Sequence, residues 1–306
     1  MAVAVTPREG GDDLVLRPRR RDWPIGALLL LPSALVFGVF VFYPLARTVQ
    51  LGMYRSDPFG GLGHFVGPSR YGKVLGSHEF RRSLGITLKF AAMTVPTGLA
   101  LGLGLAVLAH QQLKGIGFFR TIFSSTVATS VAVASLMWLT LLNPSIGLVN
   151  QALEKLGHDK IIFLQSQGWA LVSVAMATVW QNLGFTFIVI SAGLQSVPDE
   201  LLESARIDGA GPWRRFREVT LPLLSPTLLF AFVVLMINAF QTFGQVDLLT
   251  TGGPLHSTEL LVYHVFKRTS SDPSAAAAEA VVLFLIILVL TVVQLRVLER
   301  RVHYGD

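Results

Sequence analysis

The sequence lacks several residue types and patterns on which common activities depend. It contains no cysteine among its 306 residues, which excludes disulfide bonds and metal sites built from thiolates. Its seven histidines show no H-x-x-H or HExxH spacing, the patterns typical of zinc enzymes. No G-x-S-x-G or G-x-x-x-x-G-K-[ST] pattern occurs either, so neither a serine nucleophile elbow nor a phosphate loop for ATP is indicated. We therefore expect a chain that is not itself an enzyme and that has no catalytic or metal-binding residues.

Charged residues are also scarce. They make up 14% of the chain, whereas a typical soluble domain has about a quarter. Hydrophobic residues make up 52% and the mean hydropathy is +0.57, which predicts a polytopic membrane protein. The net charge is +6, and the arginines lie mainly beside apolar runs rather than among aromatic residues. Membrane lipids with anionic headgroups, and no nucleic acid, are the expected partners of this charge.

Six apolar stretches are long enough to cross the hydrocarbon core of a bilayer, which needs about 20 residues of helix. They are Pro24–Ala46, Leu84–Ala109, Thr121–Leu142, Trp169–Leu194, Leu223–Val246 and Ala275–Leu295. Within them only Lys89 and Glu279 are charged. Each lies near one end of its stretch, from which we expect its side chain to reach the interface.

The amino-terminal segment RPRRRD at 17–22 directly precedes the first apolar stretch. That stretch is longer than the apolar region of a signal peptide, and no A-x-A-like cleavage site follows it, so we expect an uncleaved first span. The positive-inside rule favours cytoplasmic termini. The expected organisation is a cytoplasmic basic arm over 1–22, a six-helix domain over 23–300 with a loop at 198–222, and a cytoplasmic tail over 301–306.

Amide side chains interrupt two of the apolar stretches. On a continuous helix Asn238, Gln241 and Gln245 would share one narrow face, and Gln181 and Asn182 lie in the preceding stretch. Amides are costly in hydrocarbon. They indicate either a hydrogen-bonding wall for a polar solute or hydrogen bonds between helices.

The second apolar stretch has small residues at helical spacing. Gly98 and Gly102 are four residues apart and Gly104 follows, a pattern that allows close approach of another helix, although glycine is common in membrane helices generally. No Asp, Glu or His lies in the middle of any stretch. This absence argues against a proton-driven transporter.

Residues 198–226, PDELLESARIDGAGPWRRFREVTLPLLSP, form the most charged segment between two apolar stretches. A proline followed by two acids opens a helix favourably, and the glycines and Pro212 predict its end near Gly209. A second short helix is expected over Trp213–Val219, broken by Leu221 and Pro222 before the next span. This segment could be an interfacial loop without a specific partner, with its aromatic residues among the headgroups. It could instead be a helix–turn–helix that contacts a soluble partner.

The spacing E-S-A-x-x-D-G-A at 203–210, with nine residues between Gly209 and V-T-L-P at 219–222, resembles the "EAA" loop of ABC-importer permeases. Ser204 and Val219 depart from the usual Ala and Ile by small changes in volume. FVGPSRYGKVL at 65–75 is similar to the F-V-G-x-x-N-Y segment of sugar-type permeases, with Arg70 where Asn is usual. LTTGGPLHSTELLVYHVFK at 249–267 resembles the T-x-G-G-P-x-x-x-T loop of the same branch.

This resemblance implies an all-α membrane protein with six transmembrane helices in the type I ABC importer permease (MetI-like) fold, located in a bacterial inner membrane. It also implies partners: a second permease subunit forming a heterodimer, two ATP-binding cassette subunits that bind the ATP and magnesium, and an extracytoplasmic solute-binding lipoprotein. This chain itself would bind no cofactor. The solute would be sn-glycerol-3-phosphate, a glycerophosphodiester, or a sugar such as maltose or trehalose; a secondary transporter is the less favoured alternative.

In such permeases the loop docks on the ATPase. The resemblance assigns this coupling role to Glu203, Ser204, Ala205, Asp208, Gly209, Ala210, Leu221 and Pro222. Asn238, Gln241 and Gln245, with Gln181 and Asn182 behind them, are the candidates for contact with solute.

Overall fold

The computed structural model describes residues 23–57, 62–111 and 114–298, and the expected basic arm and carboxyl-terminal tail lie outside these ranges. The chain forms two compact units, Met1–Arg47 and Thr48–Asp306. The described part of the first unit is helical: α1 (Trp23–Phe37) continues through a π-helical turn at Gly38–Phe42 into α2 (Tyr43–Leu51), which runs into the second unit. Its apolar length suffices for a membrane span.

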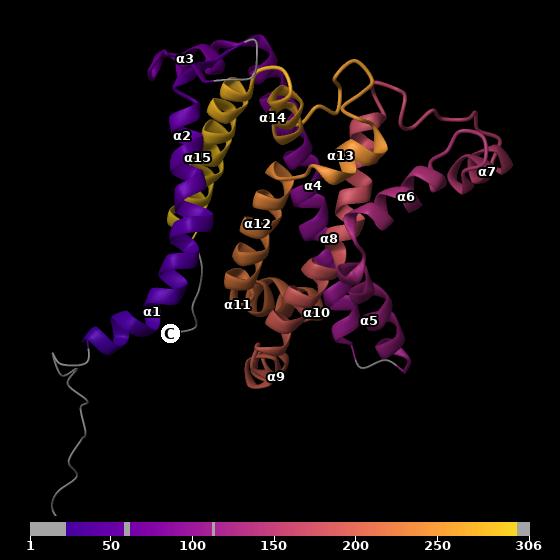
Figure 1. The fold of residues 1–306 in the computed structure, drawn as a ribbon. Coiled ribbons are helices and arrows are strands. Elements are labelled where there is room, and N and C mark those ends of the chain that lie inside the picture. Colours follow the sequence, from indigo (N-terminus) through magenta and orange to yellow (C-terminus); the bar gives the residue numbers. More distant parts are fainter. Residues whose placement is uncertain (1–22, 58–61, 112–113, 299–306) are drawn as a thin grey trace, which may run out of the picture. The chain divides into compact units, whose positions relative to one another are not determined.

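The second unit is a bundle of helices with one small hairpin (Figure 1). Its strands β1 (Tyr54–Ser56) and β2 (Leu62–Phe65) pair antiparallel, with Tyr54 opposite Phe65. The helices, in chain order, are α3 (Ser69–Gly76), α4 (His78–His110), α5 (Ile116–Ser125), α6 (Val131–Leu141), α7 (Leu148–Lys155), α8 (Ala170–Gln195), α9 (Asp199–Ile207), α10 (Pro212–Arg215), α11 (Leu221–Leu223), α12 (Ser225–Phe240), α13 (Gly244–Leu249), α14 (Leu261–Thr269) and α15 (Pro273–Leu298). A 3-10 turn at Thr126–Ala128 and a π-helical turn at Phe216–Thr220 complete them.

The long helices α4 and α8 form the centre of this bundle, and α12 packs against both. Helix α4 is longer than the apolar stretch because Ser77 caps it, its hydroxyl accepting a hydrogen bond from the Phe80 backbone N–H at 3.3 Å. Phe80 and Phe90 of α4, Val174 of α8 and Phe240 of α12 lie in the main hydrophobic core. Burial of these apolar side chains on three helices holds the bundle together.

The glycines at 98 and 102 behave differently. A Cβ atom added at Gly102 would lie 2.8 Å from the Cβ of Thr186 on α8, whereas one at Gly98 would lie 3.7 Å from its nearest neighbour, a methyl group of Leu235. Close approach of α4 to α8 therefore depends on Gly102 and not on Gly98.

Four helices are long and apolar enough to span a membrane, and two bent pairs raise the number of candidate spans to as many as six within the described residues. Two of the expected stretches are not single continuous helices. The third is divided into Ile116–Ala128 and Val131–Leu141, which meet at 108°. The fifth begins at a bend of 67° between Pro212–Leu223 and Ser225–Phe240, and α12 ends at Phe240, before the expected end at Val246. Ser130 is extended, and its hydroxyl accepts the Val133 N–H, so this residue starts a new helix rather than continuing the old one.

The two charged residues of the apolar stretches also differ. Lys89 is exposed, and its reach to the interface stays a prediction. Glu279 was expected to reach the interface, but its side chain is fully buried and its Oε1 accepts a hydrogen bond from Nη1 of Arg268 at 2.5 Å. A charged partner on α14 therefore satisfies this carboxylate inside the protein.

Candidate functional site

The loop between α8 and α12 begins with the predicted helix. Pro198 precedes α9, and Asp199 and Glu200 lie in its first turn, where carboxylates interact favourably with the helix dipole. Gly209 ends it with a φ of +78°, and the Ala210 N–H donates to the Ala205 carbonyl at 2.9 Å. This left-handed glycine closure confirms the predicted turn.

The second half of the loop differs from the expectation. Pro212 opens α10, and the helical path then continues through the π-helical turn and α11 as far as Leu223. Leu221 and Pro222 therefore do not break the helix. Pro222 lies in α11, which directly follows the π-helical turn near the end of this path, and the chain bends after Leu223 instead.

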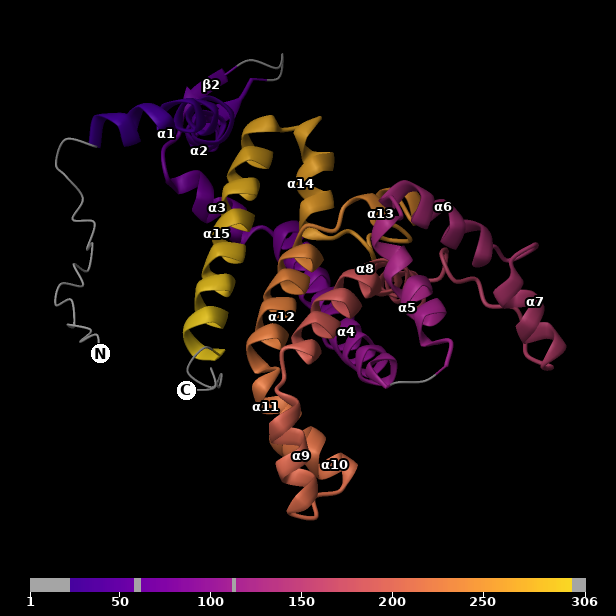
Figure 2. The same ribbon diagram turned by 90° about the horizontal axis from the view of Figure 1, so that it is seen from below.

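The loop projects from the ends of α8 and α12 (Figure 1 and Figure 2) and α9 packs on the second half of the same loop. Glu203, Ser204, Asp208 and Gly209 are exposed, and Ala205, Ala210, Leu221 and Pro222 are partly buried. Large apolar side chains are also exposed, most of all Ile207 at 86% and Trp213 at 72%.

The amide side chains come together across the bundle. Gln245 Nε2 donates to Gln181 Oε1 at 2.7 Å, and Asn238 Nδ2 donates to Asn182 Oδ1 at 3.4 Å. They join α8 to α12 and α13. Gln241 is the exception, because α12 ends at Phe240 and the exposed Gln241 lies in the turn that follows. The expected single helical face was therefore wrong beyond residue 240.

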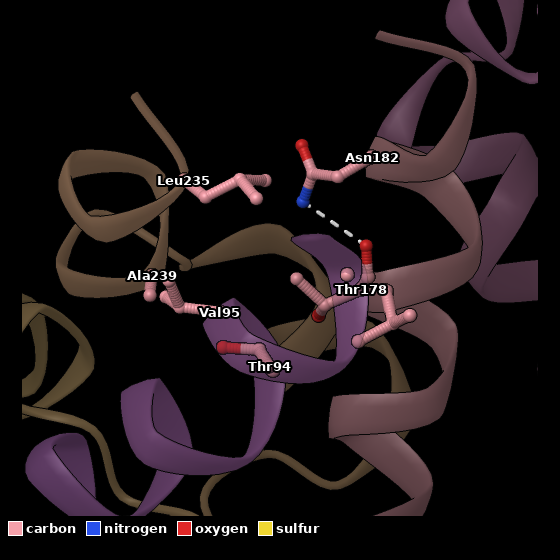
Figure 3. Close-up of a pocket in the computed structure, with 8 residues that line it drawn as sticks. Thr94, Val95, Thr178, Asn182, Leu235 and Ala239 are labelled. Atoms are coloured by element: carbon pink, nitrogen blue, oxygen red, sulfur yellow. Dashed lines mark hydrogen bonds between the residues drawn. The ribbon is translucent and has the colours of Figure 1, made fainter. Parts of the chain in front are cut away.

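A small cavity lies beside these amides, between α4, α8 and α12 (Figure 3). Its volume of about 10 Å³ leaves space for about one water molecule. Asn182 reaches its edge, and its Nδ2 donates to the Thr178 carbonyl at 3.0 Å. The lining residues are Thr94, Val95, Gly98, Thr178, Val179, Asn182, Leu235 and Ala239.

The loop before α14 is closed by the two threonines of its T-x-G-G-P-x-x-x-T sequence. The hydroxyls of Thr250 and Thr258 lie 2.8 Å apart, and Thr258 Oγ1 also donates to the Gly253 carbonyl at 2.8 Å. The Leu261 N–H then donates to Thr87 Oγ1 at 2.8 Å, which attaches the start of α14 to α4. The motif thus has a structural basis in side-chain hydrogen bonds.

A network of charged side chains follows this loop, and sequence reasoning missed it. The carboxylate of Glu259 contacts His264 Nδ1 at 2.7 Å and His256 Nδ1 at 2.5 Å. Burial would raise the pKa of Glu259, but the hydrogen bonds from the two histidines prevail and lower it to about 2. The hydrogen bond to Glu259, together with the proximity of Glu279, raises the pKa of His264 to about 9. At neutral pH this network contains a protonated histidine between two carboxylates.

The side chain of Arg70 forms an ion pair with Asp272 in the same region. Arg70 Nη2 lies 2.7 Å from both oxygens of Asp272, at the turn between α14 and α15, and Ser56 Oγ donates to the same carboxylate at 2.7 Å. These hydrogen bonds connect β1 and α3 to the start of α15. No spacing in the sequence could have revealed contacts between residues more than 200 positions apart.

The sequence of the chain matches one family of known proteins. Residues 98–304 match the model of the binding-protein-dependent transport system inner membrane component. The chain is 36% identical over 280 residues to the sn-glycerol-3-phosphate transport system permease protein UgpA of Yersinia pestis bv. Antiqua, covering 90% of this chain and 95% of the relative. It is 34% identical over 291 residues to the protein of the same name from Escherichia coli (strain UTI89 / UPEC), covering 94% and 98%.

Solved structures agree on the fold. A chain of a bacterial ABC transporter involved in the import of the acidic polysaccharide alginate superposes with a TM-score of 0.80 at 23% identity, covering 92% of this chain and 96% of that chain. A second structure of a bacterial alginate ABC transporter, in complex with an alginate pentasaccharide-bound periplasmic protein, gives a TM-score of 0.80 at 22% identity, covering 94% and 98%. The helical arrangement and the matched residues together show that this chain belongs to the family of inner membrane components of binding-protein-dependent transport systems.

Proposed function

We propose that this chain is the permease subunit of an ATP-driven importer that takes up sn-glycerol-3-phosphate or a glycerophosphodiester. The observation that carries the solute class is the 36% identity over 90% of the chain to permeases named for sn-glycerol-3-phosphate transport. The chain would form half of the translocation pathway with a second permease. A binding protein would deliver the solute, and two ATPase subunits with bound ATP and magnesium would drive the transport.

The loop at 198–222 is the proposed contact with the ATPase, with Glu203, Ser204, Ala205, Asp208, Gly209 and Ala210 forming the docking knob. Its exposure supports this role, since Ile207 and Trp213 leave apolar surface uncovered on an otherwise charged loop. In this arrangement the loop and both termini face the cytoplasm.

The connections of the loop suggest how docking is coupled to transport. Helix α8 leads into the loop and carries Gln181 and Asn182, while α12 leads out of it and carries Asn238. A displacement of the loop would therefore move both sides of the amide cluster. Opening this cluster would free the amides to form hydrogen bonds with the hydroxyl groups of a passing solute, with Gln241 and Gln245 at its far end.

The solute is tested by uptake into proteoliposomes that contain the complete importer and its binding protein. We expect ATP-dependent accumulation of radiolabelled sn-glycerol-3-phosphate and none of maltose or trehalose. Accumulation of a neutral sugar in place of the phosphate ester would refute the proposed solute.

Docking is tested by Gly209→Asp, with Gly157→Asp as a matched control. Both glycines have a φ of +78°, and at both positions an added Cβ would meet no atom within 4 Å. The backbone cost of the substitution, about 1–2 kcal/mol, is therefore the same within this chain. We expect Gly209→Asp to leave the importer assembled in the membrane but to uncouple ATP hydrolysis from uptake, and Gly157→Asp to transport normally. Equal uptake by the two variants would contradict docking at Gly209.

A further inference from the structure

A polar hollow of about 500 Å³ lies beside α14 and the start of α4. These elements lie at the end of the second unit opposite α9 and α10 (Figure 1). The hollow is bounded by the first turn of α4, the loop before α14, α14 itself and the turn into α15. Its lining residues are His78, Glu79, Arg82, His256, Glu259, His264, Lys267, Arg268, Ser271 and Asp272. None of them belongs to the amide cluster or to the 198–222 loop.

The buried and half-buried carboxylates of the hollow already have partners. Glu259 is held by His256 and His264, and Asp272 is held by Arg70 and Ser56. Glu79 is 61% exposed and lies 3.9 Å from Arg268. Each carboxylate that lines the hollow therefore lies within ion-pair distance of a basic side chain before any ligand enters.

The basic side chains that line the hollow have hydrogen-bond donors without acceptors. Within the described residues, no hydrogen bond or ion pair involves the side chain of Arg82, and its Nε is buried without a partner. His264 Nε2 is also buried without a hydrogen bond, since its nearest carboxylate, that of Glu279, is 3.6 Å away. Lys267 is 48% exposed and reaches Glu259 only at 3.8 Å. Buried donors without acceptors are costly, and an anion would satisfy them.

We propose that this hollow is a binding site for a phosphate ester, with Arg82 and Lys267 as its principal cationic contacts. The guanidinium of Arg82 offers the paired donors that suit phosphate oxygens. The choice of phosphate among anions rests on the proposed function, and so does the placement of the hollow on the side where solute arrives. The site would then receive the charged group of the solute outside the six apolar stretches of the sequence, in which no arginine occurs.

The same chemistry could come from a phospholipid headgroup, because the hollow lies at the end of the membrane helices. Binding of radiolabelled sn-glycerol-3-phosphate is therefore measured on the intact importer without its binding protein, once in a neutral detergent and once in nanodiscs containing phosphatidylglycerol. Retained phosphatidylglycerol is measured by native mass spectrometry.

The test variant is Arg82→Gln and the control is Arg81→Gln, which removes the same charge from the neighbouring, exposed position of α4. Loss of a charged hydrogen-bond pair predicts an affinity reduced about tenfold or more for Arg82→Gln, and less than about twofold for Arg81→Gln. Lys267→Gln, at a half-exposed position, gives a second variant with little effect on folding.

Arg82-dependent binding of sn-glycerol-3-phosphate supports a solute site, and Arg82-dependent retention of phosphatidylglycerol alone supports a headgroup site. The proposal is overturned if neither compound binds, or if Arg82→Gln and Lys267→Gln bind both as the wild type does. Failure of the proposed function is distinguishable, because a sugar importer would fail the uptake assay for sn-glycerol-3-phosphate whatever this direct binding measurement shows.

Discussion

Replacing Gly102 by alanine should push the backbones of α4 and α8 apart at this point and lower the stability of the bundle. The added Cβ would lie 2.8 Å from the Cβ of Thr186, and also against its Cγ2 methyl. Thr186 cannot rotate away without loss, because its Oγ1 donates to the Asn182 carbonyl at 3.0 Å. Relief must therefore come from movement of one helix backbone, at the most extensive helix contact in the bundle.

Two neighbouring glycines supply the scale for this prediction. At Gly98 the added Cβ would meet a Leu235 methyl at 3.7 Å, an ordinary packing distance, and at Gly104 it would meet nothing within 4 Å. All three substitutions gain about 0.5–1 kcal/mol from the higher helix propensity of alanine. The difference between Gly102→Ala and Gly104→Ala thus isolates the cost of overpacking, about 1–3 kcal/mol.

The assay is thermal unfolding of the assembled importer in detergent, followed by fluorescence-detected size-exclusion chromatography. Gly102→Ala should melt several degrees below Gly104→Ala, since about 1 kcal/mol shifts the midpoint by roughly 2–4 °C in domains of comparable size. Gly98→Ala should melt with Gly104→Ala. If all three variants melted together, the close approach of α4 to α8 at Gly102 would not be a feature of the assembled protein.

Two further predictions concern side-chain networks. The pKa of His264 is raised to about 9 by Glu259 and Glu279, so its contribution to stability is complete below pH 6.5 and is lost as the pH rises through about 9. Melting temperatures between pH 6 and 10 should fall more in the wild type than in Glu259→Gln; parallel curves would contradict this. A double-mutant cycle of Gln181→Ala and Gln245→Ala should give a coupling of about 0.6 kcal/mol, and zero coupling would leave only a solute role for the pair.

The elements that the sequence predicted well are those set by local chemistry. The apolar runs that became α4, α8 and α15 avoid water whatever their neighbours are. The turn after α9 was predictable because Gly209 can adopt a positive φ at little cost, and the structure shows φ of +78° there. The end of α9 and the turn that follows it are therefore determined by residues within the 198–222 loop itself.

The breaks inside the apolar stretches were not predictable in the same way. The interruption at Thr129 is stabilised by Gln181, whose Nε2 donates to the Thr129 carbonyl at 3.3 Å, and Thr126 Oγ1 accepts the Gly184 N–H at 2.8 Å. These partners lie on α8, more than 50 residues away. Hydropathy indicates which residues avoid water, but not which carbonyls find a partner outside their own helix.

Glu279 shows the same limit for charge. From its position near the start of an apolar run, the interface was the reasonable expectation, but Arg268 and His264 of α14 make burial possible. Removing one partner would leave a buried charge without compensation, so this pairing resists separation of α14 from α15.

The distribution of these contacts indicates where the permease can move. At the end with the hollow, ion pairs join α3, α14 and α15, and Thr87 joins α14 to α4. At the other end, α9 packs mainly within its own loop, and the chain bends by 67° between α11 and α12. Displacement of the loop can therefore reach α8 and α12 without first breaking buried charges. The neutral amide pairs that join α8 to α12 and α13, each worth about 0.6 kcal/mol, are the contacts that such a displacement would open first.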